Sequence, residues 1–351
     1  MSKRANKHSR KQAGPLITQK LKGVDSLLDV MRDGNEYQSI VDTVLNPNIN
    51  ILDEVIKGLK EIQRIRERSC LAYLGDVVSN RTGEFGIDQT DDLPFQEMVD
   101  SINPDIRKVD VFLATRGGSA HQVIRFVNAL RTRFDEVDFI IPSFCMSAGT
   151  LFALSGDNIW MTERACLGPI DPQIPTKDGR LVPAQALLLL VKQLQEQGQE
   201  ALNKGGNVPW AAVRIIDTID KKELGNAITA SDYSIDMATQ FLINYKFRNW
   251  NVRRTSGLDV TPDYREARAK TIANDLASHE KWKNHGHALS RDILWKEIKL
   301  EIEHPGMDLS RAIIRLWALC HWIFDKTFVL KMIVSENYKY MRFQKNLERT
   351  P

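Results

Sequence analysis

The residues best suited to chemistry lie in Ile141–Thr150, which reads Ile-Pro-Ser-Phe-Cys-Met-Ser-Ala-Gly-Thr. The apolar run Val137–Ile141 predicts a buried strand, and Thr150–Leu154 has helical character. A strand, a sharp turn and a helix would present the Ser147 hydroxyl beside the unpaired N–H groups of a helix start. Acyl transfer needs a nucleophile and an anion-stabilising pocket in one place, and this arrangement supplies both. A turn whose serine merely caps a helix has the same pattern, so this stretch alone leaves both interpretations open.

A pair of glycines lies one predicted strand earlier. Gly117-Gly118 follows Val109–Ala114, an apolar run that predicts a strand. Glycine has no Cβ, so the backbone can turn sharply there and direct an N–H group outward. A plain tight turn would use the same residues, so the pair indicates a donor site only in combination with other features.

Two titratable residues could complete a nucleophilic site. Asp171 lies 24 positions after Ser147 (171 − 147), in a rigid loop between two prolines. His285 lies in a loop far downstream, and His287 is a rival for the same role. Each also has a purely structural interpretation. Asp171 could be a carboxylate that caps the loop, and the two histidines could be ordinary surface residues.

Together these motifs resemble the serine dehydrogenase proteinase family, a distant relative of the Clp protease catalytic subunit and of signal peptide peptidase A in the Clp/crotonase superfamily. The resemblance is carried by Asp110–Ala120 with its Gly-Gly, by Pro142–Asp157 with Met-Ser-Ala-Gly-Thr, and by Leu167–Ile174 with Leu-Gly-Pro-Ile-Asp-Pro-Gln. It is strong over Asp110–Ile174 and weaker from Pro175 to Thr327. The first sixty residues lie outside it.

The resemblance implies that Ser147 is the nucleophile. The Clp protease has its catalytic histidine at the position in the sequence that corresponds to Asp171 here. The Clp order of serine, histidine and aspartate therefore does not fit this chain. The serine dehydrogenase proteinases have the order serine, aspartate, histidine, which Ser147, Asp171 and His285 reproduce. His285 would then take the serine proton, and Asp171 would hold the imidazole and stabilise its charged form.

The same resemblance implies an oxyanion hole made of backbone N–H groups. Gly118 (or Gly117) and Ala148 would supply them, and losing one such donor typically costs about 3 kcal/mol in the transition state. Cys145 is a conceivable nucleophile, but Met-Ser-Ala-Gly fits a turn-borne nucleophile better, so we interpret the cysteine as packed. His121 suits the first turn of a helix.

A lysine is the rival for the base. Signal peptide peptidases and related proteases of the superfamily use a serine–lysine pair, and both Lys177 and Lys192 lie downstream of the serine. Lys177 belongs to a Lys-Asp-Gly turn, whereas Lys192 interrupts an apolar helical run. A catalytic lysine must be desolvated to lower its pKa toward neutrality. We therefore favour His285 over either lysine as the general base.

Composition limits the class of protein. The 351 residues are 42% hydrophobic and 26% charged, as in a globular protein with a sizeable core. The net charge of +3 does not favour a nucleic-acid partner, although Met1–Gly14 is basic. The four cysteines have no CxxC spacing and suit a reducing compartment, and the first twenty residues have no secretory pattern, so we expect a cytoplasmic protein. No metal or cofactor is expected.

Alternating strands and helices predict an α/β fold. The resemblance implies that this fold is a Clp/crotonase-like spiral of ββα units, with a helical C-terminal region. From Trp210 onward the pattern predicts almost only helices, including a long one over Met307–Leu330 within an apolar stretch too interrupted by charges to span a membrane. We expect a basic, partly disordered arm (1–48), a catalytic core (49–208), a helical region contributing His285 and oligomer contacts (209–335), and a tail (336–351).

The leading function is therefore a serine peptidase that cleaves peptides or unfolded protein with a Ser-Asp-His triad. The alternatives are a Ser-Lys dyad peptidase, a crotonase-like acyl-CoA enzyme and a non-catalytic Clp-like assembly protein. The resemblance implies a homo-oligomer, in the form of a ring. Because the chain has no GxxxxGK[ST] motif, any unfolding ATPase would be a separate partner.

Overall fold

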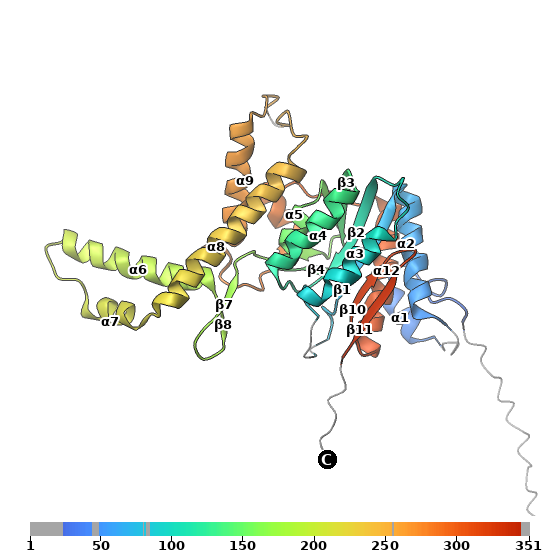
Figure 1. Cartoon of the computed structure of the whole chain (residues 1–351), viewed down its shortest axis with the longest axis horizontal. Coiled ribbons are helices and arrows are strands. Elements are labelled where there is room, and N and C mark those ends of the chain that lie inside the picture. Colours follow the sequence, from blue (N-terminus) through green and yellow to red (C-terminus); the bar gives the residue numbers. More distant parts are fainter. Residues whose placement is uncertain (1–23, 44–48, 80, 82–84, 255, 345–351) are drawn as a thin grey trace, which may run out of the picture.

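A six-stranded sheet forms the centre of the computed structural model, which describes residues 24–43, 49–79, 81, 85–254 and 256–344. Its strands lie in the order β11-β10-β1-β2-β3-β5 (Figure 1). The parallel strands are β1 (Ser69–Gly75), β2 (Lys108–Ala114), β3 (Glu136–Ile141) and β5 (Asn158–Met161). Strand β10 (Val329–Val334) runs antiparallel to β1, and β11 (Lys339–Phe343) antiparallel to β10.

Helices cover both faces of this sheet. Side chains alternate along β1, so that Leu71 and Tyr73 join one core cluster while Cys70 and Ala72 join the other. The first face is covered by α3 (Asp92–Asp100), α4 (Ala120–Arg133) and α5 (Ala148–Leu154), and the second by α1 (Glu36–Val41), α2 (Ile51–Arg66) and α12 (Met307–Lys326). The predicted α/β class is thus confirmed, whereas the finer spiral of ββα units stays a prediction.

Helix starts follow the capping chemistry expected from the sequence. The side chain of Asn50 accepts the Leu52 N–H at 3.1 Å at the start of α2. Thr261 caps α9 (Pro262–Ala277), whose first residue is a proline and whose first turn carries an acid. Both starts were predicted from the sequence and are confirmed.

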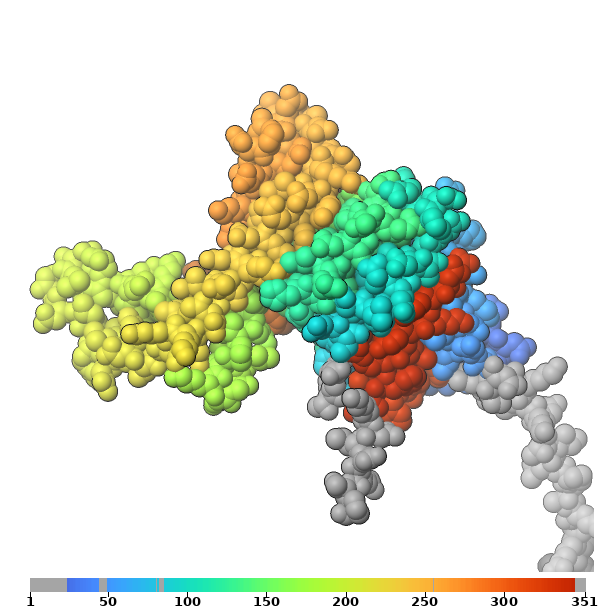
Figure 2. All heavy atoms as spheres, viewed as in Figure 1, coloured from blue at the N-terminus to red at the C-terminus, as the bar shows by residue number. Residues whose placement is uncertain are grey.

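A helical arm projects from the sheet body (Figures 1 and 2). It begins with the hairpin of β7 (Gln173–Pro175) and β8 (Leu181–Pro183) and continues through α6 (Ala184–Asn203), α7 (Trp210–Thr218) and α8 (Lys221–Phe241). The helix predicted from Pro183 to about Glu200 is therefore confirmed as α6. The far end of α8 returns to the body, where α9 packs beside it.

Besides α9, several short elements lie between α8 and α12 in the chain. Two of them are π-helical, η2 (Leu242–Lys246) and η3 (Leu294–Ile298). The others are α10 (His279–Trp282), β9 (Leu289–Ser290) and α11 (Arg291–Ile293). Across the described ranges, no helix combines the length and apolar character that a membrane crossing requires.

The prediction of an almost wholly helical chain after Trp210 is wrong at its end. Helix α12 stops at Lys326, and Val329–Val334 instead forms β10, which fills the edge of β1. Local pattern could not decide this, because a short apolar run suits a buried helix and a buried strand alike. The predicted tail also contains a strand, β11, while residues 345–351 and the basic stretch Met1–Gly14 lie outside the described residues.

Candidate active site

A small second sheet brings the candidate catalytic residues to one place. Its strands are β4 (Phe144–Cys145), β6 (Cys166–Leu167) and β9, with β4 parallel to β6 and β9 antiparallel to β6. Ser147 follows β4, Asp171 follows β6, and His285 precedes β9. Because parallel strands end at the same edge and an antiparallel neighbour begins there, all three residues emerge at one edge of this sheet.

Ser147 lies at a strained turn between β4 and α5. Its φ of 53° and ψ of −118° place a non-glycine residue at positive φ, a conformation that costs on the order of 1–3 kcal/mol. The buried Thr150 hydroxyl stabilises the turn: it lies 3.0 Å from the Cys145 carbonyl oxygen and accepts the Gly168 N–H at 3.0 Å. The predicted strand Val137–Ile141 is confirmed within β3, and Ser147 precedes a helix as predicted, but the strand directly before the serine turn is the short β4, which was not predicted.

Gly117 packs directly against the serine turn. Its φ is +105°, and a Cβ added there would lie 2.8 Å from the Cβ of Ser147. The strand leading to it is bonded to the serine strand, with the Thr115 N–H donating to the Phe144 carbonyl at 3.0 Å. Only glycine fits this contact, so the close packing of Gly117 against the serine turn requires the absence of a Cβ.

We expect Gly117→Ala to lower kcat about 100-fold, because a shift of the nucleophile by about 1 Å can cost that much. The matched control is Gly179→Ala, since Gly179 also has positive φ (+78°) but no atom within 4 Å of an added Cβ. Steady-state kinetics on both variants separates crowding of Ser147 from backbone strain alone. Equal activity in the two variants would contradict the assigned contact.

The candidate oxyanion donors differ in their hydrogen bonds. The Gly117 N–H donates to the Thr115 hydroxyl at 3.1 Å, so it is engaged within the loop. The N–H groups of Gly118 and Ala148 take part in none of the hydrogen bonds formed among the described residues. Ile87 bonds to both sides of Gly118, since its N–H donates to the Gly117 carbonyl at 2.7 Å and its carbonyl accepts the Ser119 N–H at 2.8 Å.

Asp171 and His285 are in contact although 114 residues separate them (285 − 171). Nδ1 of the histidine lies 2.7 Å from Oδ1 of Asp171, and the side chains are 21% and 1% exposed respectively. The loop around Asp171 is bonded on both sides, by the Leu276 carbonyl to the Ile170 N–H (3.0 Å) and by the Ala184 N–H to the Pro172 carbonyl (2.8 Å). With Nδ1 on the carboxylate, Nε2 is the ring nitrogen left for a proton from a hydroxyl.

His279 is a neighbour of this pair that the sequence interpretation missed. Its Nδ1 lies 3.7 Å from Oδ2 of Asp171, and both atoms are buried without a hydrogen-bond partner among the described residues. The only signal was Ser278, which caps α10 and fixes His279 at its first position. Such a cap says nothing of what the histidine faces, so sequence alone could not assign it.

The two lysines proposed as alternative bases are solvent-exposed. The Lys177 side chain is 77% exposed and forms an ion pair with Asp220 at 2.5 Å, which raises the pKa of the lysine. The Lys192 side chain is 63% exposed and lies 3.8 Å from Glu196 on the same helix. A catalytic lysine needs the opposite surroundings, in which burial lowers its pKa.

The remaining reactive residues have structural contacts. Cys145 is fully buried, and burial raises the pKa of its thiol well above the ordinary value, which disfavours the nucleophilic thiolate. The ring of His287 lies against Trp282, with centroids 5.3 Å apart. His121 on α4 is hydrogen-bonded through Nδ1 to the Tyr233 hydroxyl at 3.0 Å.

Comparison with known proteins identifies one family over part of the chain. Residues 95–202 match the family described as ClpP-like SDH-type serine proteinase, which confirms the predicted resemblance there. The matched segment contains Gly117, Gly118, Ser147 and Asp171 but ends before His285.

Two curated relatives come from Methanocaldococcus jannaschii. The uncharacterized protein MJ0137 is 36% identical over 90 residues, which are 26% of this chain and 30% of that protein. The uncharacterized protein MJ1495 is 37% identical over 73 residues, which are 21% of this chain and 25% of that protein. The chain thus spans less than a third of the length of either relative. No solved structure matches this chain.

Proposed function

We propose that the protein is a serine peptidase in which Ser147, His285 and Asp171 form the catalytic triad. The observation that carries the proposal is the 2.7 Å contact between His285 and Asp171, beside a serine held at positive φ. A histidine bonded to a buried carboxylate through Nδ1 has the tautomer that a serine nucleophile requires. The family match over residues 95–202 supports the same assignment for the serine.

The proposed reaction follows from these positions. Nε2 of His285 accepts the Ser147 proton while Oγ forms a bond to the peptide carbonyl carbon, and the resulting oxyanion is bound by the N–H groups of Gly118 and Ala148. The imidazolium then protonates the departing amine as the C–N bond breaks, and water hydrolyses the acyl-enzyme by the same route. None of the hydrogen bonds among described residues joins Ser147 to His285, and we propose that substrate binding closes this contact, as is common for catalytic hydrogen bonds.

The exposure of both lysines argues against the Ser-Lys dyad. The acyl-CoA enzyme and the non-catalytic assembly protein predict that Ser147 is unreactive, so one experiment separates them from the peptidase. A fluorophosphonate probe is incubated with the full chain and with two variants, Ser147→Ala and the matched control Ser143→Ala from the same segment. Labelling that persists in the control and disappears in Ser147→Ala is the expected result, and a wild-type protein that folds but does not label would overturn the proposal.

His279 is proposed to be a positioning residue for Asp171. Its Nδ1 and the second carboxylate oxygen are both buried and 3.7 Å apart, so a small movement would join them. Losing one charge-assisted hydrogen bond costs about 1.5 kcal/mol, or about tenfold in rate. We expect His279→Gln to lower kcat by about that factor with KM unchanged, whereas His287→Gln should leave both unchanged. A change in KM alone would assign His279 to substrate binding instead.

We propose that the arm mediates assembly into a homo-oligomer. Its surface exposes large apolar side chains, with Trp210 79% exposed at the start of α7 and Leu181 and Leu202 more than half exposed. Further apolar residues close to Trp210 in the sequence are each more than a third exposed as well, namely Val208, Val213, Ile215 and Ile216. Several exposed apolar side chains on one short element are typical of a surface that a partner covers. A second copy of the chain is the simplest partner, because every copy brings the same arm.

We expect Trp210→Ser to shift the protein to a smaller species at micromolar concentration, because the substitution removes an aromatic anchor of the kind that dominates interfaces. Size-exclusion chromatography with light scattering measures the change. Leu93→Ser is the control, since Leu93 is similarly exposed but lies on α3, in the sheet body. A wild-type protein that is monomeric under these conditions would contradict the assignment.

A further inference from the structure

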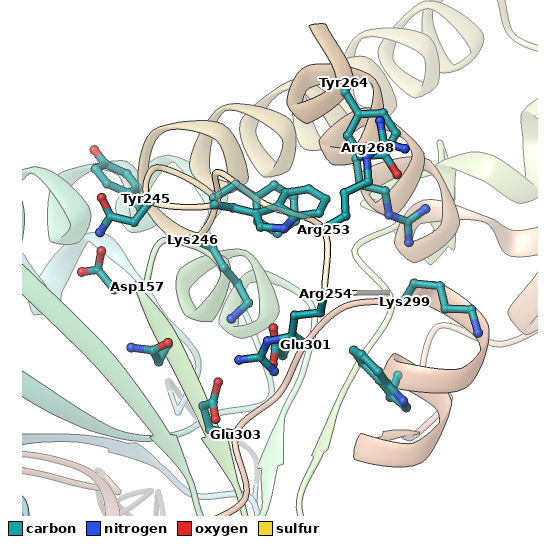
Figure 3. A pocket seen from close by; sticks show the side chains of 15 residues that line it. Asp157, Tyr245, Lys246, Arg253, Arg254, Tyr264, Arg268, Lys299, Glu301 and Glu303 are labelled. Carbon is teal, nitrogen blue, oxygen red and sulfur yellow. The ribbon is translucent and has the colours of Figure 1, made fainter. Parts of the chain in front are cut away.

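A cavity lies at the opposite end of the main sheet from Ser147. Its volume is about 660 Å³, within the range of small-molecule sites, and Figure 3 shows the side chains around it. Asp157 and Asn158 line it at the N-terminal end of β5, whereas the serine turn follows the C-terminal end of β3, which is parallel to β5. A ligand in this cavity would therefore lie apart from the candidate triad.

Rare backbone conformations converge on this cavity. The π-helical segment η2 contributes Tyr245 and Lys246, and the other π-helical segment, η3, contributes Trp295. Lys299 follows η3 with a φ of 60°, in the left-handed region that a non-glycine residue rarely adopts. π-Helical turns are well under 1% of residues and occur frequently at functional sites. Strained backbone of this kind also clusters where ligands bind.

The acidic residues of the cavity already have cationic neighbours. Asp157 is paired with Arg131 at 2.8 Å and with Arg248 at 2.7 Å. Glu301 is paired with Arg254. The Lys246 amine extends toward Glu301 and Glu303 in Figure 3, and these carboxylates oppose the lowering of its pKa by burial.

Three cations that line the cavity, Arg253, Arg268 and Lys299, have no carboxylate partner among the described residues. The guanidinium of Arg253 lies 3.5 Å from the ring centroid of Tyr264, and its buried Nε has no hydrogen-bond partner within the described chain. Within the described ranges, Arg268 donates to a backbone carbonyl, that of Ile298, and to no carboxylate. Such a surplus of positive charge in a partly enclosed space favours an anion.

Aromatic rings also line the cavity. Trp250 and Tyr264 lie with ring centroids 5.8 Å apart, and Trp295 contributes a further flat surface from η3. Planar groups stack on such rings, and guanidinium forks bind phosphate or carboxylate oxygens in pairs. The lining of the cavity therefore includes both cations that can bind an anion and rings on which a planar group can stack.

We propose that this cavity binds a small ligand in which an oxyanion, either a phosphate or a carboxylate, is attached to a planar ring. Arg253, Arg268 and Lys299 bind the oxyanion, and the rings of Trp250, Tyr264 and Trp295 hold the planar group. The site does not depend on the proposed peptidase activity, because it shares no residue with the triad.

Isothermal titration of the full chain with four probes tests the proposal. Phenyl phosphate and phenylacetate carry both parts of the ligand, inorganic phosphate lacks the ring, and benzyl alcohol lacks the charge. At least one ring-bearing anion should bind about tenfold or more tightly than the two partial probes. Preference between phenyl phosphate and phenylacetate then tells which oxyanion the site takes.

The double variant Arg253→Gln, Lys299→Asn locates the binding. Asparagine tolerates the left-handed conformation of Lys299, so the charge is removed without new strain. Losing two charge-assisted contacts should weaken the preferred probe about 100-fold, while Lys192→Gln, a distant exposed lysine, should bind as the wild type does. Quenching of tryptophan fluorescence provides a second measurement of probe binding, because Trp250 and Trp295 line the cavity.

Two results would overturn the proposal: no binding of either ring-bearing anion at about 1 mM, a weak affinity by the usual scale, or unchanged binding in the double variant. The same samples are also tested by fluorophosphonate labelling, which reports the proposed peptidase site, and by their melting temperature, which reports folding. A failure of the cavity proposal can then be distinguished from a failure of the peptidase proposal. A protein that labels at Ser147 but binds no probe would refute this site alone.

Discussion

Replacing Asp171 with asparagine is expected to lower kcat about 10⁴-fold, the loss typical for a triad whose carboxylate becomes an amide. The asparagine side chain has nearly the same shape, so the fold should be retained. However, its NH₂ group can donate to Nδ1 of His285, which favours the tautomer with the proton on Nε2. That nitrogen can then no longer accept the Ser147 proton, and the neutral amide gives the imidazolium no charge stabilisation.

The rate of fluorophosphonate labelling of Ser147 measures this loss without knowledge of the natural substrate, and hydrolysis of an unfolded protein gives kcat. Asp178→Asn is the matched control, because Asp178 lies in the nearby β7–β8 turn and pairs with the exposed Arg180. A labelling rate within threefold of the wild type in Asp171→Asn would remove the carboxylate from the mechanism. His285→Ala would then show whether the histidine acts alone.

The second large effect concerns Lys331 in β10. Its side chain is fully buried, and its amine lies 2.5 Å from Asp91, 3.0 Å from Asp88 and 2.6 Å from the carbonyl oxygen of Gly86. Removing one member of a buried ion pair typically costs about 3–5 kcal/mol, because the other charge is left buried. Arg342 also lies 3.2 Å from Asp91, so we expect Lys331→Met to lower the free energy of unfolding by about 3 kcal/mol.

Denaturant unfolding measures this change, with Lys326→Met as the control, since Lys326 is half-exposed and pairs with Asp325 at the surface. The same variant should also lose activity, because Gly86 precedes Ile87, which holds Gly118 in place. An unfolding free energy within 0.5 kcal/mol of the wild type, about the size of an ordinary surface substitution, would contradict the role of the buried pair.

The part of the site that is determined by residues close together in the sequence was predictable from the sequence. Ser147 and Gly117-Gly118 lie in turn segments that come after the apolar strands β3 and β2, and the local pattern predicts both strands. Asp171 was identifiable by its family motif, and the structure brings it to His285. The histidine could be named but not placed, because no local pattern encodes a contact across 114 residues.

Long-range pairing accounts for what the sequence interpretation missed. Strand β9 is only two residues long, too short for a pattern, yet its pairing with β6 carries His285 to the site. Strand β10 was taken for the end of a helix, and its assignment depends on the open edge of β1. No hydrophobic periodicity in a sequence predicts a π-helical turn, so the cavity beside η2 and η3 could be found only from the structure.

The position of β10 also bears on the order of events during protein synthesis. At about 5–20 residues per second, a ribosome needs roughly 10–40 s to extend the chain from Ser147 to Val334. Throughout that interval the serine already exists, but Lys331 does not yet support the loop that holds Gly118. On the proposed function, a nascent chain would therefore be inactive, and hydrolysis would begin only when its own late strand closes the sheet.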